Sequence, residues 1–568
     1  MYRHLKKLLT GVLSLTVLCA AAMPSMALDG TGNVASVDGQ EYATVQEAIN
    51  KGNGKTVTLL DDAKENVVIP EGATVTLDLG TFTLANDGAS HTITNKGTLT
   101  IQGSGKVDNE NHGKAALWNE GTAVLNGGTF DRSKEAGSSA EASGSNSYYT
   151  VVNHGNMTIN DGVTITQNGK FSSLLENGWY NGAENKSGQP SVLTIKGGTF
   201  SGGLNTIKND DYGELIVEGG TFTNVAQAAL LNWNEAEISG GDFQADEGSS
   251  CVILNGYLDD TMDAGKLTIT GGTFTGGDST DALNTMGGSS NSGNIQISGG
   301  TLNGDIVLGA ASNSAAGTLA ISGSAVVNGS VTNTKKDNVT ISGGSVAGEV
   351  SNSGDGSTSI TGGAFAQKPA DEYIGGASAV AKYQAAGGAA AYYIGEESIN
   401  QAAANAESGS TIEVLKGDVK LDITADDVIV KNSGDGDVTV NDQDVPAGDE
   451  GVVTHTHKAE KKEAKEATCT ETGNQEYWYC AGCGKYFSDE ALTKEISKED
   501  IIIPATGTTS SKPEDTSKPG DPTSSNSENS NRPQTGETSQ FTLWVALLVL
   551  AGGSFAGVAL SRSKRKAS

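Results

Sequence analysis

A short motif recurs along most of this chain and limits what the chain can fold into. The motif consists of an apolar residue, any residue, two glycines, threonine and phenylalanine, as at 195–200 and 217–222. Exact and weaker copies number twelve between residues 80 and 363, at a mean spacing of about 26 residues. Self-similarity of this period is typical of solenoids, in which each repeat packs mainly against its neighbours.

Each repeat is predicted to form strands rather than helices. Apolar and polar residues alternate around the motif, as in 267–270, and this period of two residues excludes helical repeats. Glycine accounts for 77 of the 568 residues, about twice its usual share, and is concentrated in the motif's turns. We therefore expect an all-β solenoid of about twelve coils over residues 71–366.

Asparagines mark a second position in the repeat. One asparagine precedes the apolar motif residue by six positions in five copies (Asn95, Asn119, Asn153, Asn232 and Asn291) and by eight in four more (Asn209, Asn313, Asn333 and Asn352). Asparagine tolerates left-handed backbone, and its amide can stack on an asparagine of the next coil. We expect an amide ladder that locks the coils in register.

The repeat resembles right-handed parallel β-helices of the pectate lyase-like class, particularly those of bacterial surface proteins, over roughly residues 36–366. Coils of unequal length suit that class, because its turns accept insertions. The resemblance implies a right-handed parallel β-helix with a core of Ile, Leu, Val and Phe.

Residues 28–70 are predicted to cap the first coil. Thr44 and Glu47 have the spacing of a capping box, which starts a helix, and Gly52 is suited to end it. The residues 57–60 then read as a strand.

A similar pattern returns after the last coil. A second helix is expected to start at 398–401 and to stop at Gly409, with a strand at 412–415. Residues 367–450 are therefore either a C-terminal cap or a second short β-module, and the sequence leaves both open.

The two ends of the chain are predicted to be targeting segments. Residues 1–27 combine an early basic cluster, an apolar run and the small residues Ser25 and Ala27, which is typical of a cleaved signal peptide. At the other end, the apolar stretch 541–560 is about 30 Å long as a helix, enough to cross a bilayer, and a basic tail follows it. Taken alone, this stretch would be a permanent membrane anchor.

The pentapeptide just before the apolar stretch changes that interpretation. It reads Arg532, Pro533, Gln534, Thr535 and Gly536. The order of pentapeptide, apolar span and basic tail over 532–568 resembles the sorting signal of sortase-anchored, LPXTG-like cell-wall proteins of Gram-positive bacteria. The resemblance implies cleavage between Thr535 and Gly536 and covalent attachment to peptidoglycan. Arg532 departs from the usual leucine, which leaves the class of sortase open.

Composition separates two further segments and narrows the partners. Residues 508–531 are almost wholly polar and rich in Ser, Thr and Pro, so we expect a disordered spacer across the wall. The chain has 37 basic and 68 acidic residues, a net charge of −31. A surface this negative repels phosphate backbones, so nucleic acid is not an expected partner.

A small module at 451–507 holds candidate metal ligands. Three cysteines and a histidine can provide four ligands of a tetrahedral structural zinc site: His457, Cys469, Cys480 and Cys483. The run resembles a zinc-ribbon-like module of Firmicutes surface proteins. A disulfide with one leftover thiol, or free thiols, are the alternatives. Cys251 lies in an apolar run and is expected to be buried in a strand.

Six aromatic residues are candidates for binding sugar. They fall in the segments between coils: Trp118, Trp179, Tyr180, Tyr212, Trp233 and Tyr257. Aromatic rings there can form a platform for sugar rings while Asn and Asp bond the hydroxyls. The alternative is that these rings only cover apolar sides of the solenoid.

Catalysis is less favoured than binding. Lyases of the β-helix class use a basic residue beside a calcium-bound uronate, but Arg132 is the one arginine between the two ends and no acidic cluster is expected near it. A glycoside hydrolase needs two carboxyl groups at a defined separation, for which 210–211 and 259–260 are the candidates.

The sequence thus predicts an extracellular, wall-anchored adhesin or glycan-binding β-helix without enzymatic activity. Its expected partners are peptidoglycan, attached covalently, and host or environmental glycans. A wall-anchored polysaccharide hydrolase and a surface spacer without a specific ligand remain the alternatives.

Overall fold

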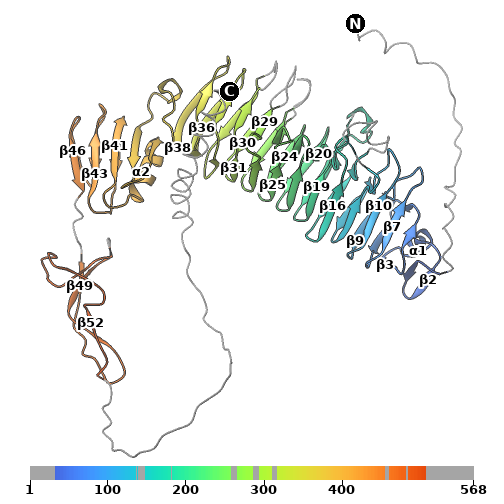
Figure 1. Cartoon of the computed structure of the whole chain (residues 1–568), viewed down its shortest axis with the longest axis horizontal. Coiled ribbons are helices and arrows are strands. Elements are labelled where there is room, and N and C mark those ends of the chain that lie inside the picture. The colour runs from blue at the N-terminus through green and yellow to red at the C-terminus, as the bar shows by residue number, and fades with distance from the viewer. Residues whose placement is uncertain are drawn as a thin grey trace, which may run out of the picture. The chain divides into compact units, whose positions relative to one another are not determined.

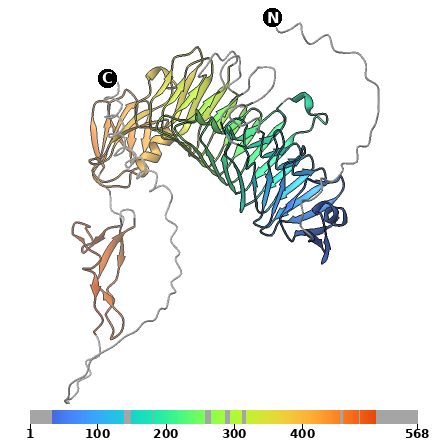
Figure 2. The same ribbon diagram turned by 45° about the vertical axis from the view of Figure 1, so that its right-hand side comes forward.

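The computed structural model describes residues 32–135, 137, 148–180, 182–256, 265–285, 293–309, 316–453, 459–481 and 484–506. The chain divides into two compact units, whose boundary crosses the strands between residues 257 and 282. Each unit is built almost wholly of strands, which Figure 1 shows as successive arrows and Figure 2 shows turned by 45°.

The first unit is a stack of coils in which equivalent strands pair in parallel. One coil contributes β18 (Ser191–Ile195), β19 (Thr199–Gly202) and β20 (Asn205–Asn209). The next contributes β21 (Gly213–Val217), β22 (Thr221–Asn224) and β23 (Ala228–Asn232). Each strand of the first coil pairs in parallel with its counterpart in the next. This arrangement is compatible with the β-helix solenoid expected from the repeat.

The two motif glycines serve different purposes. A Cβ on Gly240 would lie 2.2 Å from the carbonyl oxygen of Glu218 in the preceding coil, so no side chain fits there. Gly241 has a φ of +103°, which L residues with a side chain rarely adopt. The first glycine therefore allows neighbouring coils to approach, and the second allows the chain to turn.

The phenylalanines of the motif form one continuous row inside the first unit. Rings of Phe200, Phe222, Phe243 and Phe274 stack with centroids 4.7, 4.3 and 5.0 Å apart, and all four side chains are fully buried. Offset stacking at these separations is favourable for aromatic pairs. The repeat spacing thus places phenylalanine at the same position in four successive coils, and Ile165 takes this position in the coil before them.

A second sheet of the first unit carries the predicted amide ladder. Its strands pair in parallel and comprise β5 (Val67–Ile69), β8 (Ile93–Asn95), β11 (Leu117–Asn119), β14 (Val151–Asn153), β17 (Leu175–Asn177), β20, β23 and β26 (Cys251–Asn255). Buried amides bond from coil to coil at 2.7–2.9 Å through Asn95, Asn119, Asn153, Asn177, Asn209, Asn232 and Asn255. The ladder is confirmed for the five of these that the spacing identified.

Other asparagines depart from that expectation. Asn177 and Asn255 belong to the ladder but lie farther ahead of the next motif, because long segments separate them from it. Asn333 pairs in register with Asn352, yet its amide donates to the carbonyl of Asp337 in its own turn. The predicted members Asn291 and Asn313 lie outside the described residues.

The predicted N-terminal helix is confirmed as α1 (Val45–Lys51), with Thr44 as its N-cap and Gly52 as its C-cap. The side chain of Thr44 accepts from the N–H of Glu47. The carboxylate of Glu65, from the neighbouring coil, accepts from the first two N–H groups of the helix. An acidic residue distant in sequence thus completes the cap. Negative charge is stabilising at this position, because the N-terminus of a helix carries partial positive charge. The strand expected at 57–60 is β3 (Lys55–Leu59).

The second unit begins with parallel coils and then changes direction. Strands β33 (Thr318–Ile321), β36 (Asn338–Val346) and β38 (Thr358–Phe365) pair in parallel. Strand β38 then pairs antiparallel with β40 (Ala390–Ile394), which pairs with β39 (Val380–Gln384). The segment after 367 therefore continues the sheet in antiparallel fashion.

The helix expected in the second unit forms two residues earlier than predicted. It is α2 (Glu396–Ala404), with Gly395 as N-cap and Asn405 as C-cap. Ser398 does not cap it, because its hydroxyl instead accepts from the N–H of Gly363 in β38. The prediction that the helix extends to Gly409 is wrong, because the helix ends at Ala404. The strand expected at 412–415 is confirmed as β41 (Thr411–Lys416).

Residues 379–453 of the second unit share one apolar core. Its members come from α2 and the surrounding strands and include the fully buried Ile399, Val414, Leu421, Val428 and Val430. Partly buried alanine and tyrosine side chains pack against this core. β41 pairs in parallel with β43 (Val428–Asn432), and β43 pairs antiparallel with β46 (Glu450–Val453).

Residues 459–506 form a small antiparallel module. Its four-stranded sheet contains β47 (Ala459–Lys462), β49 (Tyr477–Cys480), β50 (Tyr486–Phe487) and β51 (Glu495–Ile496), and a separate pair joins β48 (Gly473–Asn474) to β52 (Ile502–Ile503).

Candidate functional site

The candidate site lies on the outer side of the amide-ladder sheet. In each three-residue strand the asparagine and the first residue face the core, so the middle residue faces outward. Trp118, Val152, Glu176 and Lys208 occupy this middle position in successive coils and are direct register partners. The last three are nonetheless buried, at 0%, 3% and 6% exposure. Turn segments therefore cover this part of the sheet.

An aromatic row runs along the end of these strands. We use this name for His91, Trp118, His154, Trp179 and Tyr212, whose ring centroids lie 4.5, 4.6, 4.7 and 6.3 Å apart in that order. The first and third contacts are stacked, and the other two are edge-to-face. Five successive coils contribute one ring each, but the rings occupy different positions, from four residues before the ladder asparagine at His91 to three residues after it at Tyr212.

Both histidines of the row are neutral at pH 7. Burial lowers the pKa of His91 to about 4, and the nearby charge of Lys114 acts in the same direction. Burial likewise lowers the pKa of His154 to about 4. Nδ1 of His91 accepts from the N–H of Ala115, which fixes the ring against Trp118. Burial away from a compensating negative charge is what keeps these imidazoles neutral.

Lys208 stands between two aromatic rings. Its Nζ lies 4.4 Å from the ring centroid of Tyr180 and 4.2 Å from that of Trp233. The same Nζ lies 2.8 Å from Oδ2 of Asp210. A buried ammonium requires such partners, and cation–π contacts are strongest when the cation is shielded from water.

Two buried carboxyl groups meet beside this lysine. Glu176 and Asp210 are 3% and 0% exposed. Burial is the largest cause that raises the pKa of Glu176 well above its usual range, and the charge of Asp210 raises it further. Burial also raises the pKa of Asp210, which Lys208 opposes. We name Glu176, Lys208, Asp210, Tyr180 and Trp233 the Lys208 cluster.

The predicted aromatic candidates divide by exposure. Tyr180 is 69% exposed, whereas Trp179 and Trp233 are buried at 9% and 7%. Trp118 and Tyr212 are half-buried within the aromatic row. Tyr257 lies outside the described residues. The structure thus brings five of the six onto one stretch of the first unit but leaves one of them, Tyr180, widely open to solvent.

The acidic pair expected in a turn is also buried. Asp210 and Asp211 are 0% and 6% exposed, and the second accepts from the N–H of Gly182. Glu176, which sequence reasoning missed, is the carboxyl next to Asp210, and the two are close enough to hydrogen-bond. A hydrogen-bonded pair is closer than the two catalytic carboxyl groups of a glycosidase, which lie about 5 Å or more apart. The other candidate pair, 259–260, lies outside the described residues.

Arg132 has an acidic partner that was not assigned to it from the sequence. Its guanidinium is fully buried and forms an ion pair of 3.1 Å with Glu135, which is also buried. It also donates to the backbone carbonyls of Asn111 and Lys114. An acidic partner three residues away was readable in the sequence. Enclosed in this way, Arg132 pins a turn of the stack.

The predicted zinc ligands are only partly described. Cys469 is exposed and Cys480 is buried at the end of β49, whereas His457 and Cys483 lie outside the described residues. Among the residues that are described, no group of three or more His, Cys, Asp or Glu side chains is arranged to hold a metal ion. Cys251 is fully buried in β26, as predicted.

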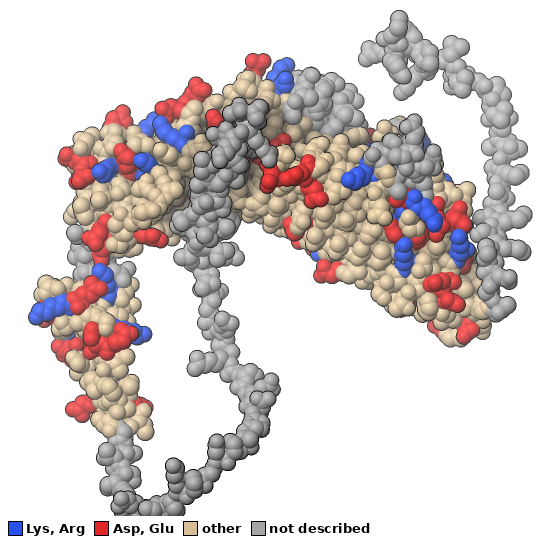
Figure 3. Space-filling model, in the orientation of Figure 1, with Lys and Arg blue, Asp and Glu red and all other residues tan. Residues whose placement is uncertain are grey.

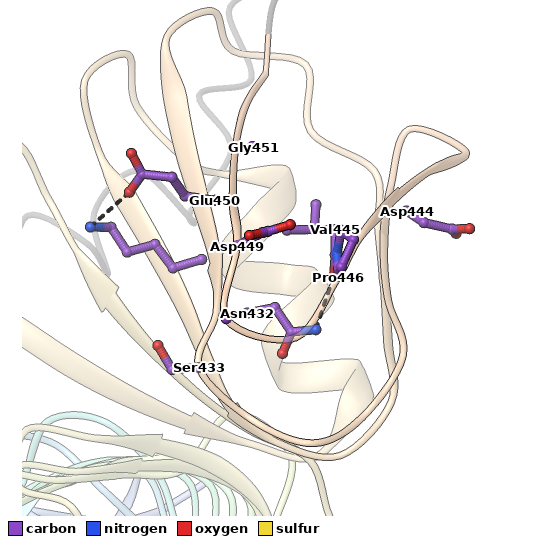
Figure 4. A pocket seen from close by; sticks show the side chains of 10 residues that line it. Asn432, Ser433, Asp444, Val445, Pro446, Asp449, Glu450 and Gly451 are labelled. Carbon is purple, nitrogen blue, oxygen red and sulfur yellow. Dashed lines mark hydrogen bonds and ion pairs between the residues drawn. The ribbon is translucent and has the colours of Figure 1, made fainter.

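A shallow pocket of about 510 Å³ opens in the second unit (Figure 4). Asp444, Asp449 and Glu450 line it, and Lys431 pairs with Glu450 at 3.0 Å. The amide of Asn432 donates to Val445 and Gly436 within the wall. Two of its polar side chains, those of Lys431 and Asn432, thus already bond within the pocket wall.

The surface shown in Figure 3 carries acidic side chains beside many of its basic ones. Two ion pairs of the first unit are of this kind: Lys64 pairs with Asp87 at 2.8 Å and Lys106 with Asp131 at 2.8 Å. Among the described residues, no helix is long and apolar enough to cross a membrane, and the apolar stretch 541–560 lies outside them.

Comparisons with known proteins add no relative. No family model, no curated protein and no solved structure matches this chain.

Proposed function

We propose that this chain is a secreted surface protein, anchored to the cell wall, that binds glycan on the outer side of its amide-ladder sheet. The stack would be a right-handed parallel β-helix of the pectate lyase-like kind. Its parallel coils, paired glycine turns and amide ladder support this proposal. Such a stack presents one long surface on which each coil contributes one residue.

One observation carries the binding proposal. Tyr180 is the most exposed large hydrophobic side chain among the described residues, at 69%. The ring of Tyr180 lies over the ammonium of Lys208, and the neighbouring residue, Trp179, belongs to the aromatic row. An exposed, oriented ring beside polar groups is the arrangement on which a sugar ring stacks.

The structure also selects the variants that test it. Trp179 and Trp233 are buried, so their replacement would disturb packing rather than remove a contact. Tyr180→Ala removes an exposed ring and is expected to weaken binding to glycans on an array about tenfold or more, since one anchoring aromatic contributes about 1.5 kcal/mol. Phe171→Ala, at a residue 44% exposed, is the matched control and should bind as the parent does. Equal binding by both variants would contradict the proposal, and no binding by the parent would favour a spacer.

Export and anchoring form the second part of the proposal. Residues 1–27 would be removed on export, and a sortase would join Thr535 to peptidoglycan after cutting before Gly536. The polar segment 508–531 would then carry the folded units across the wall.

We further propose that His457, Cys469, Cys480 and Cys483 hold a structural zinc ion in the small module. The donor set supports this, because thiolate and imidazole are the ligands that zinc prefers in structural sites. The module has few apolar residues buried, among them Cys480, Phe487 and Ile501, and a small core of this kind benefits from a metal. Metal analysis of the purified protein is expected to give about one zinc per chain, and Cys480→Ser should lose it. A metal-free parent would contradict this.

A further inference from the structure

Tyr180 is held from beneath by charged side chains rather than by apolar packing alone. Its backbone N–H donates to Oε1 of Glu176 at 3.1 Å. Its ring lies over Nζ of Lys208 at 4.4 Å, and Trp233 lies on that ammonium at 4.2 Å. Asp210 lies 2.8 Å from the same Nζ. Backbone and ring of Tyr180 are thus fixed by two neighbouring coils at once.

The charges of this cluster balance only if it holds a proton. Two carboxyls and one ammonium are each at least nine-tenths buried. Neither oxygen of Asp210 has a partner in good hydrogen-bond geometry, although Oδ2 forms the ion pair with Lys208. A proton on Glu176 supplies the missing donor to Asp210, while Oε1 of Glu176 still accepts from Tyr180. The cluster is then neutral, which burial favours.

We propose that Glu176, Lys208 and Asp210 are positioning residues that, with one proton shared between the two carboxyls, hold Tyr180 as the anchor for an uncharged glycan. This rests on the proposed function. The ligand class follows from charge: the protein has a net charge of −31, which repels uronate-rich or sulfated sugars. The cluster itself is neutral, so it offers no countercharge to an acidic sugar.

Rising pH is expected to release the anchor. The charged and titratable groups facing the two carboxyls are Lys208, Asp211, Tyr148, Tyr149 and the neighbouring Tyr180. Burial raises the pKa of Tyr148 to about 12, so this ring stays neutral over the range of interest. A carboxyl with a raised pKa contributes stability at low pH that is lost as pH rises through that pKa. Ionised Glu176 would place a second negative charge beside Asp210.

Binding of neutral hexose oligosaccharides and of matched uronic-acid oligosaccharides is the first readout, measured from pH 6 to 9. The parent should prefer the neutral set and weaken as pH rises. Glu176→Gln, which keeps an acceptor for Tyr180 and a donor for Asp210, should bind within about twofold at pH 6 and lose the pH dependence. Lys208→Met, which keeps the length of the side chain, should weaken binding about tenfold.

Trypsin cleavage after Lys186 is a second readout that needs no sugar. Lys186 lies six residues after Tyr180 in an exposed segment, so release of Tyr180 should expose it further. Lys208→Met should be cut faster than the parent, and Glu176→Gln at the parental rate. Unchanged binding and cleavage in Lys208→Met would overturn the proposal, as would a parental pH profile in Glu176→Gln. A parent that binds no sugar overturns the proposed function, and the cleavage rates then still decide whether these residues hold Tyr180.

Discussion

At the scale of single residues, the amide ladder is the feature that most directly couples one coil to the next. Asn209 accepts from the amide of Asn177 and donates to Asn232 and to the carbonyls of Gly213 and Glu235. It is fully buried. Removing its side chain therefore breaks bonds to two other coils and takes away the donor to the buried Oδ1 of Asn232.

Asn209→Ala is expected to lower the free energy of unfolding by about 3 kcal/mol, because each buried polar group left unpaired costs about 1–3 kcal/mol. Denaturant unfolding followed by tryptophan fluorescence measures this, since the tryptophans at 118, 179 and 233 lie in the same unit. Asn126→Ala, which breaks an exposed amide contact with Asn160, should cost less than about 0.5 kcal/mol. Equal losses in both variants would show that a buried ladder amide stabilises the fold no more than an exposed amide contact does.

The two histidines of the aromatic row predict acid sensitivity. Their folded pKa values are lowered to about 4, so the unfolded chain binds more protons between about pH 4 and 6.5. Their stabilisation is complete above about pH 6.5 and is lost as pH falls toward 4. Between pH 7 and 5 each should contribute a loss of about 1–2 kcal/mol.

His154→Phe isolates this effect, because phenylalanine retains an aromatic ring between Trp118 and Trp179 but cannot be protonated. The variant should lose less stability than the parent on going from pH 7 to pH 5, measured by thermal unfolding. Identical slopes for parent and variant would exclude a role for His154 in the acid response.

At the scale of elements, the turn between strands depends on both motif glycines. Gly240→Ala would place Cβ 2.2 Å from a backbone carbonyl of the preceding coil, and backbone cannot move aside cheaply. We expect a loss of about 3 kcal/mol, or failure to fold. Gly248→Ala, where the nearest atom lies 3.4 Å away, should change stability by less than about 0.5 kcal/mol. A stable Gly240→Ala protein, with thermal unfolding like that of the control, would contradict this role of the turn.

Elements with a repeating cause could be predicted from the sequence, and elements fixed by distant partners could not. Strand alternation and glycine spacing act locally, so β3, β41 and the stacked coils follow from them. The start of α2 did not, because Ser398 bonds to β38 instead of capping the helix. In α1 the final cap comes from Glu65 in another coil, which no local pattern contains.

The same distinction explains the candidate site. The aromatic residues stood out because large rings are rare in a chain with 5% aromatic residues. Glu176 and Lys208 did not stand out, since each is a single charged residue in a short strand, and only the register places them side by side on neighbouring strands. Tyr180 is exposed, whereas its neighbour Trp179 is buried. This difference depends on the turn that folds back onto Asp211, which accepts from the N–H groups of Trp179 and Gly182.

At the scale of the whole molecule, two compact units precede a long polar segment. The 508–531 segment and the sorting signal that follows it belong to the part of the chain outside the described residues, and their role is a proposal from sequence. If the proposal is right, binding at Tyr180 takes place on the outside of the cell wall, where the wall bond holds the protein against flow.

The mass of the C-terminal peptide released from purified cell walls tests this claim most directly. Walls are digested with a muramidase and then with a protease, and peptides that end at Thr535 are analysed. We predict a peptide whose Thr535 carbonyl is joined to a peptidoglycan stem peptide, with Gly536 and all later residues absent. Recovery of the protein from the membrane fraction with residues 536–568 intact would contradict covalent anchoring and favour a permanent membrane anchor.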